Sequence, residues 1–95
     1  MSDVIEGAVA ALNEKIGTSF DGLAKFIING EGSVVIDSDG ARAGDDEADV
    51  TLTADADVFQ SLITGDLDAT MAFMGGKLSV DGDMGLALKL AATLN

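Results

Sequence analysis

The chain has 95 residues, 47% of them hydrophobic, which indicates one folded domain over residues 1–95. It contains no cysteine or histidine, so disulfides, thiol chemistry, zinc fingers and histidine-based acid–base catalysis are excluded. Its 17 acidic and 5 basic residues give a formal net charge of -12, which opposes binding to nucleic acid and tight docking on anionic membranes.

The first predicted element is a helix between Asp3 and Gly17. Asp3 and Glu6 resemble a capping box, and Gly17 suits the left-handed position after the last turn. The apolar residues recur at helical spacing: Ile5, Val9, Leu12 and Ile16.

The middle third alternates between apolar and polar residues and predicts strands. "AKFII" leads into the tight-turn dipeptide Asn29-Gly30, "SVVID" returns, and "ADVTLTA" follows after a second turn at "SDG". We expect an antiparallel meander, with a short additional strand over residues 41–43.

The last third predicts two helices, a strand and a final helix. "DADVFQSLITG" places Val58, Phe59, Leu62 and Ile63 on one helical face after capping Asp residues and ends at Gly65. Asp68 then caps a short helix, "KLSVDG" forms a strand, and Asp83 caps a helix from Met84 to Leu94. Because this final helix is apolar on most sides, we expect it to lie inside the stack of elements.

The order of elements predicts an α+β fold, with a mostly antiparallel sheet of about five strands and the helices packed on one side. No segment has the roughly 20 apolar residues of a membrane span. The acidic stretch "DSDGARAGDDEAD" resembles a calcium loop, but Ala41, Arg42 and Ala48 stand where ligands or glycine are needed. We therefore expect no metal site, no cofactor and no catalytic residues.

The remaining signal is a set of apolar residues in the last 40 positions, including three methionines. Methionine side chains are flexible and often line surfaces that accept varied apolar partners. The set is compatible with ordinary core packing or with a cavity for a lipid or another apolar ligand. Its members are Phe59, Leu62, Ile63, Met71, Phe73, Met74, Met84, Leu86, Leu88 and Leu90.

The stretch from Leu62 to Leu90 closely resembles the sterol carrier protein 2 (SCP2) domain family. That family carries a "G-x-L-x-P-x-x-A-F-x-x-G-K-L-x-x-x-G-D/N-M-x-L-A-x-K-L" run, with Ala69 here in the position of the proline. The matching residues are Gly65, Leu67, Ala72, Phe73, Gly76, Lys77, Leu78, Gly82, Asp83, Met84, Leu86, Ala87, Lys89 and Leu90.

The resemblance implies a non-catalytic protein that binds or transfers a fatty acid, fatty acyl-CoA, phospholipid or sterol in an apolar tunnel between sheet and helices. The alternative is a ligand-free protein-interaction domain that uses its apolar C-terminal helix. We expect a cytoplasmic monomer, with a dimer as the alternative, that contacts membranes transiently. The expected lipid-binding residues are Phe59, Leu62, Ile63, Phe73, Met84, Leu86 and Leu90.

Overall fold

The computed structural model describes residues 3–16 and 20–94. Four helices and five strands follow one another in the predicted order. They are α1 (Asp3–Lys15), β1 (Ala24–Asn29), β2 (Gly32–Asp37), β3 (Gly40–Ala43), β4 (Val50–Asp55), α2 (Ala56–Thr64), α3 (Ala69–Met74), β5 (Leu78–Gly82) and α4 (Met84–Leu94). The predicted α+β fold is confirmed, whereas Gly17, expected to end the first helix, lies outside the described residues.

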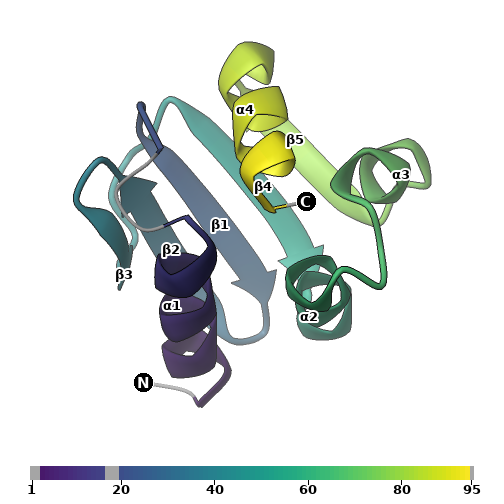
Figure 1. Cartoon of the computed structure of the whole chain (residues 1–95), viewed down its shortest axis with the longest axis horizontal. Coiled ribbons are helices and arrows are strands. Elements are labelled where there is room, and N and C mark those ends of the chain that lie inside the picture. The colour runs from purple at the N-terminus through teal and green to yellow at the C-terminus, as the bar shows by residue number, and fades with distance from the viewer. Residues whose placement is uncertain (1–2, 17–19, 95) are drawn as a thin grey trace.

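The five strands form one sheet in the order β3-β2-β1-β4-β5. Figure 1 shows α1, α2 and α4 in front of this sheet and α3 beside the β5 edge. The core lies between the two layers because alternate strand residues face the helices. Phe26, for example, is fully buried and meets Phe59 of α2 edge to face, with ring centroids 4.7 Å apart.

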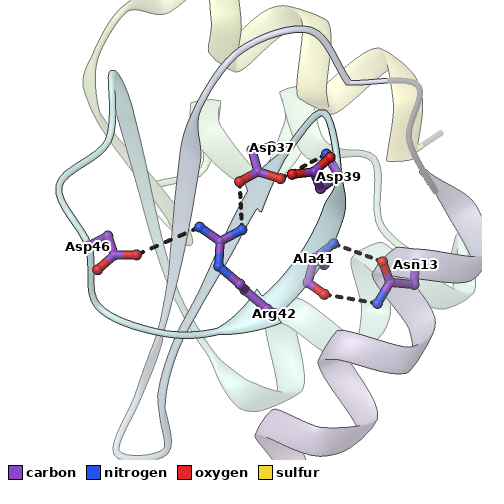
Figure 2. Close-up of polar contacts among 6 residues, drawn as sticks. All are labelled: Asn13, Asp37, Asp39, Ala41, Arg42 and Asp46. Atoms are coloured by element: carbon purple, nitrogen blue, oxygen red, sulfur yellow. Dashed lines mark hydrogen bonds and ion pairs between the residues drawn. The ribbon is translucent and has the colours of Figure 1, made fainter.

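The expectation of a continuous antiparallel meander is wrong at β4. This strand pairs in parallel with β1 in the middle of the sheet, with Ala24 opposite Val50 and Asn29 opposite Asp55, while every other strand pair is antiparallel. The outer edge of β3 is occupied instead by Asn13 of α1. Its amide donates to the carbonyl of Ala41 at 2.9 Å and accepts from the Ala41 N–H at 2.8 Å (Figure 2).

The chain reaches β4 by crossing the sheet face that the helices leave open. Gly44 N–H donates to Ser33 of β2, Asp45 pairs with Lys25 of β1 at 3.1 Å, and Asp49 N–H donates to the carbonyl of Leu23. Lys25 and Ser33 lie on the face opposite the core, since they alternate with buried Phe26 and Val34. The crossing segment explains why Val35, also on that face, is fully buried.

Arg42 of β3 lies among the carboxylates of the nearby acidic turn. Its guanidinium contacts Asp37 and Asp46 (Figure 2). The hydrogen bond from Arg42, with a second from the Asp39 N–H, lowers the pKa of Asp37. Among the described residues, no group of three or more acidic side chains is placed to hold a metal ion.

Candidate functional site

The helices α3 and α4 begin where the sequence predicts. The Asp68 carboxylate accepts from the N–H groups of Thr70 and Met71 at the start of α3. The Asp83 carboxylate caps α4 in the same way. These caps fix α3 and α4 on either side of β5, because each satisfies backbone donors that a helix start leaves unpaired.

The final helix is not covered on most sides, contrary to the prediction. α4 buries Ala87 and Leu90 against the sheet, but Leu88 is 61% exposed and Met84 is 46% exposed. The reason is its position over β4 and β5 at one end of the sheet (Figure 1), where no other helix covers its outer side. The apolar residues that need cover therefore remain at the surface.

An apolar groove of about 270 Å³ lies between α3, β5 and α4. Strand residues form its floor, and the two helices form its walls. Among the described residues, no charged one lines it, and Thr70 is the one lining residue with a polar side chain. The lining residues are Leu52, Ala69, Thr70, Phe73, Met74, Leu78, Val80, Met84, Ala87, Leu88 and Ala91.

Small residues create the space in this groove, and large flexible ones surround its mouth. On the α4 wall, Ala87 and Ala91 have small side chains that do not fill the groove. At the mouth, Met74 is 76% exposed and Phe73 is 43% exposed. The groove is therefore open to solvent, and its rim consists of side chains that can close over an apolar ligand.

The seven residues predicted to bind lipid fall into three places. Phe73 and Met84 line the groove between α3 and α4. Phe59 and Ile63 line a second groove of about 350 Å³ between α1 and α2, and its lining also includes Asp3, Gln60 and Thr64. The others pack in or against the core and line neither groove: Leu62, Leu86 and Leu90.

Several groove residues are absent from the predicted set. The spacing of Met84, Ala87, Leu88 and Ala91 places them on one side of a helix, and this pattern could have identified the α4 wall. Ala87 and Ala91 are not distinguished by sequence, because a small apolar residue on a helix is equally compatible with core packing. The strand floor includes Leu78 and Val80, neither of which was predicted to belong to the site.

Comparison with known proteins gives a consistent result. The profile of the SCP-2 sterol transfer family matches residues 6–95. Hydroxysteroid dehydrogenase-like protein 2 of Xenopus tropicalis is 33% identical over 99% of this chain, which spans 24% of that protein. Peroxisomal multifunctional enzyme A of Dictyostelium discoideum is 40% identical over 87% of this chain and is matched over 18% of its own length.

One solved structure has the same fold as this chain and is moderately similar to it in sequence. It is the solution structure of sterol carrier protein-2 from Aedes aegypti in complex with the C16 fatty acid palmitate. The two chains superpose with a TM-score of 0.79 at 25% identity, covering 99% of this chain and 96% of the other. The chain thus spans nearly the whole of this single-domain structure but about a quarter of the Xenopus relative.

Proposed function

Because the chain belongs to the SCP-2 sterol transfer family, we propose that it binds the acyl chain of a fatty acid or related lipid, without chemical change, in the groove between α3, β5 and α4. The observation that carries the proposal is the uncharged lining of that groove beneath a rim of exposed apolar side chains. The palmitate complex of the Aedes relative supports the ligand class.

The driving force would be removal of acyl methylenes from water. Each buried methylene contributes about 0.8 kcal/mol, so about ten of them contribute about 8 kcal/mol, equivalent to a dissociation constant of about 1 µM before the costs of association. The groove volume of about 270 Å³ lies just below the roughly 300 Å³ at which small-molecule pockets begin. A long chain therefore requires α3 and α4 to separate, and the groove extends into a tunnel only when it is occupied.

The α1–α2 groove is the weaker candidate although it is larger. Its lining includes Asp3, and covering a charged residue with an acyl chain costs free energy that the uncharged groove does not require. The larger groove would suit an acyl ligand only if Asp3 turned away.

A pair of variants on α4 tests the proposal. Ala91→Phe places a ring in the groove, whereas Ala92→Phe places the same ring on the exposed neighbouring position. The affinity for a fluorescent fatty acid should fall at least about tenfold in the first variant and stay within about twofold of the unmodified chain in the second. Equal affinity in both variants would place the acyl site elsewhere.

The alternative of a ligand-free interaction domain has one observation in its favour, the exposed apolar side of α4. Native mass measured after purification without detergent separates the two functions. An excess that disappears on denaturation and matches a fatty acid or phospholipid supports the carrier. A bare chain that self-associates with concentration and takes up no fluorescent fatty acid supports the alternative.

A further inference from the structure

Four exposed apolar side chains line the groove, and Met71, three residues before Met74 on the same helix, lies next to them; the five together are here called the α3–α4 patch. Soluble proteins seldom gather large apolar side chains at one exposed place without a binding role. Met71 and Met74 of α3 are 63% and 76% exposed, and Leu88 of α4 is 61% exposed. Phe73 and Met84 complete the patch at 43% and 46%.

The acidic residues are excluded from the segments that form the patch. All 17 lie outside residues 69–80 and 84–95, although the formal net charge is -12. These two segments contain Lys77 and Lys89 instead. The segments that form the patch thus carry no acidic residue of their own, which lowers the electrostatic cost of approach to a phosphate-bearing surface.

The carboxylates nearest in sequence to the patch either accept hydrogen bonds or lie on the opposite face of the sheet. Asp68 and Asp83 accept hydrogen bonds from backbone N–H groups in the first turns of α3 and α4. Asp81 lies on the sheet face opposite the core, because its neighbour Val80 packs against the core. Asp66 accepts from the Thr64 hydroxyl at 3.1 Å.

We propose that the α3–α4 patch docks on a zwitterionic phospholipid surface, so that the groove opens directly onto the bilayer. Met and Phe side chains would enter the region between headgroups and acyl chains, and Lys77 would meet lipid phosphates. The inference rests on the proposed function in one respect, because docking matters for acyl transfer only if the groove holds the acyl chain.

A second copy of this chain fits the patch less well. Two copies would each bring a net charge of -12 and their own Lys77 to the same contact. Five side chains are also far fewer than the roughly 20 to 30 residues that each partner contributes to a standard interface. A bilayer demands neither matched shape nor opposite charge over that area.

Met71 provides the test, since it belongs to the patch but does not line the groove. Met71→Asp should reduce co-sedimentation with phosphatidylcholine vesicles at least about tenfold, because a carboxylate replaces an inserted apolar side chain. The matched control is Val4→Asp on α1, an exposed apolar residue outside the patch, which should leave binding within about twofold. Thermal unfolding checks that both variants remain folded.

Salt provides a second, independent readout. Binding of the unmodified chain to phosphatidylcholine should change by less than about twofold between about 0.05 M and about 0.5 M NaCl, because insertion is apolar. Binding to vesicles rich in phosphatidylserine should be weaker at low salt and strengthen as salt screens the repulsion. The opposite salt dependence would overturn the proposal.

The remaining outcomes distinguish docking at the α3–α4 patch from docking at α1, from self-association and from no membrane contact. Loss of vesicle binding in Val4→Asp but not in Met71→Asp would move docking to α1. Failure of the unmodified chain to bind vesicles, or self-association that Met71→Asp abolishes, would overturn the proposal in favour of no membrane contact or a second copy. Fatty acid binding without vesicles is measured separately, so its failure would refute the proposed function and not the docking.

Discussion

Gly82 combines a positive φ with a close contact to the backbone of another strand segment. Its φ of 106° lies in the region that disfavours side chains, and an added Cβ would lie 2.4 Å from the Asp49 carbonyl oxygen. That carbonyl accepts the Asp83 N–H at 2.9 Å, so it cannot shift without losing a bond that joins β5 to the start of β4. The glycine of the family run therefore has a structural reason in this chain.

Gly82→Ala should lower the free energy of unfolding by about 3 kcal/mol, since strained φ and backbone overlap add. Gly30→Ala is the control, because φ is also positive there, at 80°, but nothing lies within 4 Å of an added Cβ. Its cost should be about 1 kcal/mol. Urea unfolding measures both, and equal costs would show that the contact with Asp49 has no effect.

Leu88 and Leu90 separate binding from stability on one helix. Leu90 is fully buried, so Leu90→Ala should lower the free energy of unfolding by about 2 to 5 kcal/mol. Leu88 is 61% exposed and lines the groove, so Leu88→Ala should change stability by less than about 0.5 kcal/mol and weaken fatty acid binding several-fold. A reversed pattern in urea unfolding and ligand titration would contradict the assignment of the α4 wall.

At the scale of elements, Asn13 determines how one edge of the sheet ends. Its amide pairs with both the N–H and the carbonyl of Ala41 (Figure 2), which protects β3 from adding another strand. Asn13→Ala should lower the free energy of unfolding by about 1 to 2 kcal/mol, because two backbone groups lose their partner.

Asn13→Asp refines this test. The carboxylate keeps an acceptor for the Ala41 N–H but places negative charge beside the Ala41 carbonyl in the position of the donor. Protonation restores a donor, so its deficit relative to the unmodified chain should shrink below about pH 4. A deficit independent of pH would show that the amide donor contributes nothing.

The elements themselves were predictable because their signals are local. Alternation in "ADVTLTA" identifies β4, and the capping role of Asp68 identifies α3. The partner of β4 was not predictable, since Asn13, which occupies the edge of β3, and the residues that hold the crossing segment on the far side of the sheet are distant from β4 in sequence. Asp55 precedes α2 as predicted, but its carboxylate accepts from Asn29 and makes no cap.

The candidate site could be predicted only in part, for a related reason. Composition indicated an apolar function for the last third, but not which side chains point together. Leu90 and Leu88 look alike in sequence, yet one is buried and the other lines the groove. The position of α4 over the end of the sheet decides between them, and that position is a property of the whole fold.

At the scale of the molecule, the net charge of -12 opposes folding through self-repulsion. Each of the ion pairs described has at least one exposed partner, such as Asp45 in the Lys25–Asp45 pair, so solvent screens it and it contributes little to stability. Raising NaCl from about 0.01 M to about 0.5 M should therefore raise the unfolding temperature, because screening relieves more repulsion than it weakens attraction. A lower unfolding temperature at high salt, measured by calorimetry, would show that attraction within the ion pairs outweighs the repulsion between acidic residues.

The position of the acyl chain between α3, β5 and α4 can be measured with a spin-labelled fatty acid added to isotope-labelled protein, by recording which amide signals broaden. We expect loss of signal at Thr70, Val80 and Ala87, which line that groove, with little change at Val4 and Gln60. Broadening at Val4 and Gln60 instead, in the groove between α1 and α2, would contradict this position.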